Sequence, residues 1–322
     1  MTDNATQRIP PTAIIIFTFN VMVWGSSFIL MKRGLVVFSP IEVALLRVVI
    51  AGLCLAPFAL RAIGRARGKL PFAKLALTSL TGTAIPSFLF PYAQQELPSG
   101  TVGVLNSTTP LFAFILGLVF FGLQFQWDKL AGLLIGLAGA VALILLKPGE
   151  AGGASPRLDP NFLYGILPVI ATISYAINAN YVRYYLNHLS PLTASSVSLF
   201  IAVVPAMLPL LLFTDFLQHL QAPGGWAALG YVFLLGAIGT ALTVALFYRL
   251  ISLAGPLFAT SVSYAIPIVA LLWGVIDGEP LGWLHLIGLG LILAGVYLVG
   301  RRKAHHRPNR QKSSPSRVEE PA

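Results

Sequence analysis

The sequence predicts an all-α integral membrane protein with ten transmembrane helices, arranged as two inverted five-helix repeats. Three observations support this prediction. Hydrophobic residues make up 56% of the 322 residues and charged residues only 10%, with a mean hydropathy of +0.80, whereas soluble domains carry about 25% charged residues. The apolar residues also fall into stretches of membrane-span length, and an ordered series of residues recurs in both halves of the chain.

The predicted spans follow one another with short connections. They lie at residues 13–34, 40–60, 71–92, 99–122 and 128–146 in the first half, and at 161–186, 191–213, 226–249, 255–276 and 283–300 in the second. Each supplies close to the roughly 20 apolar residues that a span needs. The first lacks a clear small-x-small cleavage site and is interpreted as an uncleaved span rather than a signal peptide.

The chain is therefore divided into a leader (1–12), a first repeat (13–146), a Gly- and Pro-rich loop (147–160), a second repeat (161–300) and a basic tail (301–322) that we expect to be disordered. If the N-terminus is cytoplasmic, 16 of the 21 Lys and Arg residues lie on the inner side and four on the outer side. The positive-inside rule then predicts a bacterial-type inner-membrane protein with both termini in the cytoplasm. Seven cations lie in the tail, so the net charge of +10 favours contact with anionic lipid over nucleic acid.

The repeat is visible when the chain is compared with itself. A shift of 151 residues places Ser39-Pro40 on Ser190-Pro191, Trp24 on Tyr175 and Ser27 on Asn178. A shift of 157 places Gly82-Thr83-Ala84 on Gly239-Thr240-Ala241, and Pro110 on Pro267. Because five spans is an odd number, the second half enters the membrane from the opposite side, an arrangement typical of secondary transporters.

Several of these segments resemble EamA-type proteins of the drug/metabolite transporter superfamily. The matching segments are Trp24-Gly25-Ser26-Ser27-Phe28 followed by Lys32, Leu46-Arg47 followed by Ala51, Thr109-Pro110-Leu111-Phe112 through Gly122, Gly132 through Gly139, Pro267, Gly278-Glu279, and Gly288 through Gly295. The resemblance spans about residues 12–301. It implies a ten-helix bundle around a central cavity and the transport of small metabolites, often the export of amino acids. Gly122-Leu123-Gln124 stands where the family usually has Gly-Glu, so the subfamily and the substrate stay open.

Polar residues at membrane depth are the candidate substrate-binding groups, because such groups are costly unless they face protein or a water-filled cavity. Ser174, Tyr175, Asn178 and Tyr181 form one stripe of the sixth span, and the repeat pairs Tyr175 with Trp24 and Asn178 with Ser27. The stripe either lines a cavity or joins helices by hydrogen bonds.

Prolines mark the other candidate positions. Asn106 precedes Pro110, and Ser263 and Tyr264 precede Pro267. A proline removes a backbone donor, so the freed carbonyls either contact substrate or are satisfied by local hydroxyls. Hinge or kink positions are predicted at Gly82, Pro86, Pro110, Gly239 and Pro267.

Arg47 is the deepest full charge in the predicted spans, roughly 10 Å along the second span. It either attracts a substrate carboxylate, pairs with Glu42 or Glu96, or snorkels towards the interface. Lys32 resembles the family lysine near the outer end of the first span, and the resemblance implies a role in anchoring or gating.

Missing motifs limit the function classes. No Asp or Glu lies in the middle of a predicted span, Cys54 is the single cysteine, and no metal-ligand spacing or catalytic set is present. The sequence thus predicts no enzyme, cofactor or metal. It predicts a secondary transporter that exports small metabolites such as amino acids by alternating access. The alternatives are sugar-phosphate, nucleotide-sugar or drug-like cargo on the same fold, or a channel or membrane enzyme; the oligomeric state stays undetermined.

Overall fold

The computed structural model describes residues 10–122, 162–278 and 283–300, with separate positions between 125 and 139 and the pairs 146–147 and 157–158. The predicted leader up to residue 9, most of the 147–160 loop and the basic tail 301–322 lie outside the described residues. So does much of the predicted span at 128–146. The contact of the tail with anionic lipid therefore stays a prediction.

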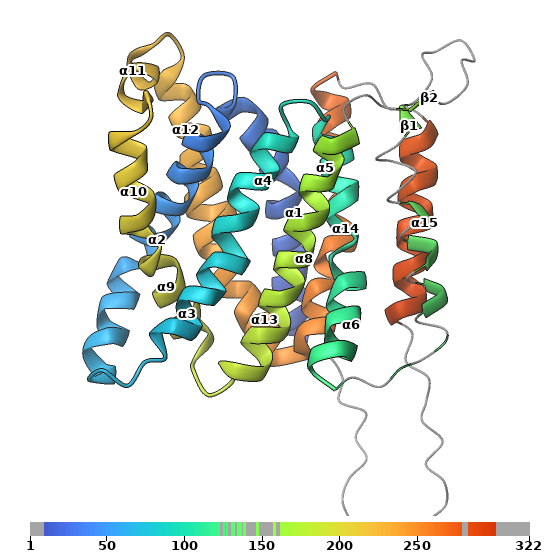
Figure 1. The fold of residues 1–322 in the computed structure, drawn as a ribbon, viewed down its shortest axis with the longest axis horizontal. Helices are drawn as coiled ribbons and strands as arrows, with labels where there is room; N and C mark the ends of the chain where they lie inside the picture. Colours follow the sequence, from blue (N-terminus) through green and yellow to red (C-terminus); the bar gives the residue numbers. More distant parts are fainter. Residues whose placement is uncertain are drawn as a thin grey trace, which may run out of the picture.

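The first half is built from long helices that cross the molecule in alternating directions (Figure 1). They are α1 (Pro11–Gly34), α2 (Pro40–Ala66), α3 (Phe72–Ser79), the π-helical segment η1 (Leu80–Ala84), α4 (Ile85–Ala93), α5 (Ser99–Asn106) and α6 (Thr109–Phe120). α2 begins at a capping box, in which the Ser39 side chain accepts from the Glu42 amide and the Glu42 carboxylate accepts from the Ser39 amide.

The second half repeats this pattern. It contains α8 (Phe162–Tyr185), α9 (Pro191–Ile201), α10 (Val203–Leu212), α11 (Phe216–Gln221), α12 (Gly225–Gly236), a second π-helical segment η2 (Ala237–Leu242), α13 (Thr243–Thr260), α14 (Val262–Ile276) and α15 (Trp283–Gly300). Gly255 turns the chain within α13 at a φ of +84°, a value that glycine adopts without strain. Between the halves, β1 (Leu146–Lys147) and β2 (Arg157–Leu158) pair antiparallel.

Several helices differ from the prediction. α2 continues to Ala66 rather than ending near residue 60, and the short α11 lies in a segment predicted as a connection. The predicted helices at 99–122 and 191–213 are each divided in two, at residues 107–108 and at Ala202. Each break lies a few residues before a proline, Pro110 or Pro205, which has no N–H to donate to the carbonyl four residues earlier.

Among the residues that the structure describes, seven helices are long and apolar enough to cross a membrane, by length and composition. They are Pro11–Gly34, Pro40–Ala66, Ser99–Phe120, Leu163–Tyr185, Pro191–Leu212, Gly225–Pro256 and Phe258–Ile276. Large apolar side chains such as Phe120, Phe213 and Ile276 are exposed. The prediction of an all-helical membrane protein is thereby confirmed, whereas the count of ten spans stays a prediction.

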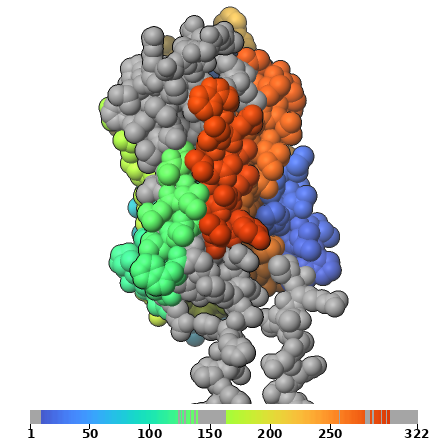
Figure 2. Space-filling model, turned by 90° about the vertical axis from the view of Figure 1, so that its right-hand side faces the viewer, coloured from blue at the N-terminus to red at the C-terminus, as the bar shows by residue number. Residues whose placement is uncertain are grey.

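The two halves interleave. α1 packs against α14, α2 against α9, and α4 and α6 against α8, so the main contacts join opposite halves. α15 lies at one side of the bundle, where it contacts α6 and α14 (Figures 1 and 2). Gly295 of α15 fits closely against the backbone of Gly132 and Gly136, where an added Cβ would lie 2.3 Å from the Gly132 oxygen. The interleaving places the interface between the halves at the centre of the bundle.

Candidate functional site

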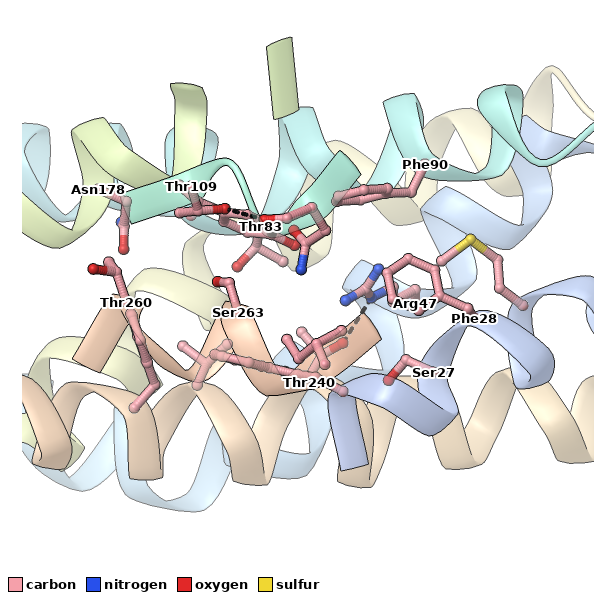
Figure 3. Close-up of a pocket in the computed structure, with 18 of the residues that line it drawn as sticks. Ser27, Phe28, Arg47, Thr83, Phe90, Thr109, Asn178, Thr240, Thr260 and Ser263 are labelled. Carbon is pink, nitrogen blue, oxygen red and sulfur yellow. Dashed lines mark hydrogen bonds between the residues drawn. The ribbon is translucent and has the colours of Figure 1, made fainter. Parts of the chain in front are cut away.

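A cavity lies between the two halves (Figure 3). The space free of atoms is about 790 Å³, open solvent at its mouth included. The first half contributes Trp24, Ser27, Phe28, Met31, Arg47, Gly82, Thr83, Phe90, Asn106 and Thr109. The second half contributes Tyr175, Asn178, Thr240, Val244, Phe247, Tyr248, Thr260, Ser263 and Ile266. The walls thus combine aromatic rings with hydroxyl and amide groups.

The lining residues correspond in pairs between the halves. At the 157-residue shift Thr83 falls on Thr240, Phe90 on Phe247, Asn106 on Ser263 and Thr109 on Ile266; at the 151-residue shift Trp24 falls on Tyr175 and Ser27 on Asn178. Arg47 breaks the pattern, because it falls on Ser198, whose hydroxyl is hydrogen-bonded to Thr78 Oγ1 at 2.7 Å. The cavity therefore receives a cation from one half only.

Arg47 is 6% exposed and reaches from α2 into the cavity. Its Nε donates to Thr240 Oγ1 at 2.7 Å, shown dashed in Figure 3, and its guanidinium interacts with the Tyr175 hydroxyl. Neither carboxylate considered as a partner pairs with it: Glu42 binds His219 Nδ1 at 2.9 Å, and Glu96 is exposed just beyond α4. Within the described part of the chain, Arg47 has no acidic partner at ion-pair distance.

Two side chains form hydrogen bonds between the halves, one to Thr78 near the end of α3 and one to Gly239 in η2. Asn178 Nδ2 donates to the Thr78 carbonyl at 2.9 Å and to the Tyr248 hydroxyl at 3.2 Å. Trp24 Nε1 donates to the Gly239 carbonyl at 3.0 Å. Asn178 and Trp24 thus both line the cavity and form hydrogen bonds between helices, so the two interpretations of Asn178 apply together.

Asn106 ends α5 at the break before Pro110. The carbonyl of Asn106, which Pro110 leaves without a backbone donor, accepts from Thr109 Oγ1 at 2.8 Å. The alternative in which a local hydroxyl satisfies the kink is therefore correct for this carbonyl. The side-chain oxygen Oδ1 is buried and has no hydrogen-bond partner, and the residue lines the cavity. It is thus an unpartnered acceptor in a residue of the cavity wall.

Comparison with known proteins gives the family. The EamA-like transporter family matches residues 11–145 and 163–301, one match in each half. The chain belongs to the EamA-like transporter family. These are membrane transporters and not enzymes, as the sequence predicted, and the two matches agree with repeated halves.

Relatives of this EamA-like transporter differ in what is known of them. It is 29% identical over 280 residues to an uncharacterized inner membrane transporter, YedA, of Escherichia coli, covering 86% of this chain and 87% of that protein. It is 26% identical over 311 residues to a probable terminal-alkyne amino-acid exporter of Streptantibioticus cattleyicolor, covering 95% and 98%. A solved structure described as "Crystal structure of protein" shares the fold, with a TM-score of 0.61, 19% identity, and coverage of 89% and 96%.

Of the other predicted site residues of the EamA-like transporter, some line the cavity and others pack elsewhere. Ser263 lines the cavity, but Tyr264 packs against the apolar cluster around Val104, Leu105 and Leu111. Tyr181, predicted on the polar stripe, packs against the Tyr185 ring at 4.5 Å between centroids. Pro86 and Pro110 stand at the starts of α4 and α6, whereas Pro267 lies inside α14, six residues after the break at Ser261.

Sequence reasoning missed several lining residues of the EamA-like transporter, among them Thr83, Thr240, Phe90, Phe247 and Thr260. The repeat did contain a signal for the first four. Gly82-Thr83-Ala84 and Gly239-Thr240-Ala241 were recognised as equivalent, and the same shift pairs Phe90 with Phe247. Thr260 has no such signal, since Gly103 is its counterpart at that shift.

Away from the cavity, an ion-pair cluster joins the ends of α1 and α14. Lys32 Nζ lies 2.5 Å from Asp277 Oδ2, and Arg33 also pairs with this carboxylate. The hydrogen bond from Lys32, with the charges of both cations, lowers the pKa of Asp277 below its ordinary value of 3.8, although desolvation opposes the shift. Lys32 therefore joins helices of the two halves.

Proposed function

We propose that this protein exports small metabolites that bear a single carboxylate, such as amino acids, across the inner membrane by alternating access. In this proposal the chain has ten spans in two inverted five-helix repeats, and both termini are cytoplasmic. The substrate contacts are Trp24, Ser27, Arg47, Asn106, Tyr175, Asn178 and Ser263. Gly82, Pro86, Pro110, Gly239 and Pro267 permit the helices to bend.

The observation that supports this substrate class is Arg47. A buried cation at membrane depth is costly unless an anion or a polar group compensates it. Arg47 lines the cavity at 6% exposure, and the described residues offer it no carboxylate. A substrate carboxylate would supply the missing charge through charge-assisted hydrogen bonds to the guanidinium.

The rest of the cavity favours an amino acid among carboxylates. The Asn106 Oδ1 atom is an unpartnered acceptor for an ammonium group, and Ser263 adds a hydroxyl. The rings of Trp24 and Phe247, 5.2 Å apart, offer an apolar wall to a side chain. A relative described as a probable amino-acid exporter agrees with this class. With Arg47 as its cation, the cavity matches a substrate with one negative charge. A dianionic phosphate would favour two or more cations.

Comparative metabolite analysis tests the proposal directly. Medium and cytoplasm of cells with and without the expressed protein are compared for all small metabolites. We expect one class of carboxylate-bearing solute to be enriched outside and depleted inside. A solute gained inside would instead mean uptake, and enrichment only of solutes that lack a carboxylate would contradict the role of Arg47.

Arg47→Gln is expected to reduce export of that solute at least tenfold. A hydrogen bond to a charged group contributes about 1.5–3 kcal/mol, and about 1.4 kcal/mol corresponds to a factor of ten. Initial export rates, normalised to membrane-inserted protein, give the measurement. Arg249→Gln is the matched control, since Arg249 is an exposed arginine of α13. Equal export by the native protein and Arg47→Gln would refute the assignment.

A further inference from the structure

We propose that Thr240 is a positioning residue, which orients the Arg47 guanidinium towards the substrate from the π-helical segment η2. This inference rests on the proposed role of Arg47 in binding a carboxylate. Thr240 is 1% exposed, and its Oγ1 atom accepts from Arg47 Nε at 2.7 Å (Figure 3). The two residues are separated by 193 positions in the sequence and come from opposite halves.

The hydroxyl of Thr240 is oriented by a second hydrogen bond. Thr240 Oγ1 donates to the Leu235 carbonyl at 3.0 Å. A threonine hydroxyl has one proton and two lone pairs. Because its proton is engaged by Leu235, the oxygen presents a lone pair to Arg47, and the arginine can only donate. The two bonds are thus mutually consistent and fix the direction of the Arg47 Nε–H.

The π-helical turn makes this arrangement possible. In an α-helix, a threonine hydroxyl bonds the carbonyl three or four residues earlier, whereas Leu235 is five residues before Thr240. The segment also lies close to α2: a Cβ on Gly236 would come within 2.8 Å of Ile50 and 3.2 Å of the Arg47 carbonyl. Gly236 therefore permits the close approach that brings Thr240 within reach of Arg47.

The hydrogen bond to Thr240 affects how Arg47 can bind a substrate carboxylate. The hydrogen bond from Nε to Thr240 fixes the plane of the guanidinium. Because the group is planar, this bond also fixes the directions of the N–H bonds on the two terminal nitrogens. Two parallel N–H groups in a fixed plane match a carboxylate better than a freely rotating head group does. The hydroxyl is expected to act on carboxylate recognition alone, without touching substrate itself.

Thr83 provides a matched control within the same chain. It is the counterpart of Thr240 at the 157-residue shift, lies in η1, is buried, and lines the same cavity. The arginine has no counterpart on that side, since Arg47 falls on Ser198. Thr83→Val therefore removes a hydroxyl from the cavity wall, as Thr240→Val does, but it breaks no hydrogen bond to an arginine.

The test compares probes with and without the carboxylate. Purified full-length protein in detergent is titrated calorimetrically with each L-amino acid and its α-carboxamide, and the amino acid bound most tightly is carried forward with its amide. We expect the native protein to prefer the acid, and Arg47→Gln to lose the preference. Thr240→Val should weaken binding of the acid about five- to tenfold and leave the amide unchanged. Thr240→Ser should retain native values, and Thr83→Val should leave the ratio of the two affinities unchanged.

The outcomes separate the two proposals. Loss of the preference in Arg47→Gln but not in Thr240→Val would overturn the positioning role and leave the role of Arg47 intact. A preference that survives Arg47→Gln, or no binding of any amino acid by the native protein, would overturn the proposed function and this inference with it. Thr240→Ala serves if Thr240→Val does not fold. In the Arg47→Gln background the Thr240 substitution should have no further effect, whereas a general structural role would persist there.

Discussion

At the residue scale, Gly82 packs closely against Asn178 in the cavity wall. A Cβ on Gly82 would lie 2.5 Å from Asn178 Nδ2, the atom that bonds the Thr78 carbonyl and the Tyr248 hydroxyl. Real Cβ contacts do not come so close, so a side chain at this position would displace the amide. Gly82 thus has a packing role in η1, beyond the bending that its sequence position predicted.

Gly82→Ala is expected to lower the free energy of unfolding by about 1–3 kcal/mol, the usual cost of overpacking. Thermal unfolding of the purified protein in detergent gives the comparison. Gly64→Ala is the control, because an added Cβ there meets nothing within 4 Å; it should be neutral or stabilise by up to about 1 kcal/mol. Similar destabilisation by both substitutions would show that Asn178 is not the cause.

Individual residues show how far the sequence predicts the site. Trp24, Ser27, Tyr175 and Asn178 were identified by self-comparison, and all four line the cavity. Tyr264 was included because it adjoins Ser263, but neighbours on a helix point about 100° apart, and it packs into an apolar cluster instead. Arg47 bonds Thr240, and Glu42 pairs with His219. Both partners lie far away in the sequence, and composition and spacing do not specify the packing that brings them together.

At the element scale, the helices were predictable and the π-helical turns were not. The prolines at 110 and 205 explain the two broken helices by a local rule. Hinge positions were predicted at Gly82 and Gly239 within η1 and η2, and at Pro86 just after η1, but a glycine or a proline does not by itself specify a π-helical turn. Side chains of other helices bond carbonyls in or beside these segments: Trp24 donates to Gly239 within η2, and Asn178 donates to Thr78 near the end of α3, just before η1.

The ion-pair cluster between α1 and α14 gives a pH-dependent prediction. The lowered pKa of Asp277 means that its charged form stabilises the fold above the ordinary value of 3.8, and that this contribution is lost as the pH falls through the lower folded value. Asp277→Asn should therefore destabilise the protein by up to about 1 kcal/mol at pH 7. The difference should diminish as the pH is lowered below 3.8.

Unfolding temperatures of the native protein and Asp277→Asn at pH 7 and pH 3 test this expectation. Asp215→Asn is the control, because Asp215 is exposed just before α11 and its side chain forms no cap hydrogen bond there. A difference for Asp277→Asn that is equal at both pH values would contradict the electrostatic explanation.

At the scale of the whole molecule, the repeat was the most informative property of the sequence. Two family matches and paired lining residues agree with repeated halves. The interleaving of the halves could not be read from the sequence, because a shift relates equivalent residues and does not say which helices pack together. The orientation in the membrane follows from charge alone and stays a prediction.

Single cysteines test that orientation in a Cys54→Ala background. Val36→Cys lies between α1 and α2 at a position 75% exposed, and Lys69→Cys lies between α2 and α3 at an exposed position. With both termini cytoplasmic, a membrane-impermeant maleimide should label Val36→Cys in intact cells, and Lys69→Cys only after permeabilisation. The reverse pattern would mean that both termini face outwards.

The hydrogen bond from Trp24 to Gly239 also gives the protein an internal optical probe. Of its five tryptophans, Trp127, Trp226, Trp273 and Trp283 are exposed on the outside of the bundle, and Trp24 is the one that lines the cavity. Brominated lipids quench the emission of indoles that face the acyl chains, and an indole enclosed by protein is shielded from them. The fluorescence that remains in such lipids will therefore come mainly from Trp24, and its wavelength will report how wet the cavity is.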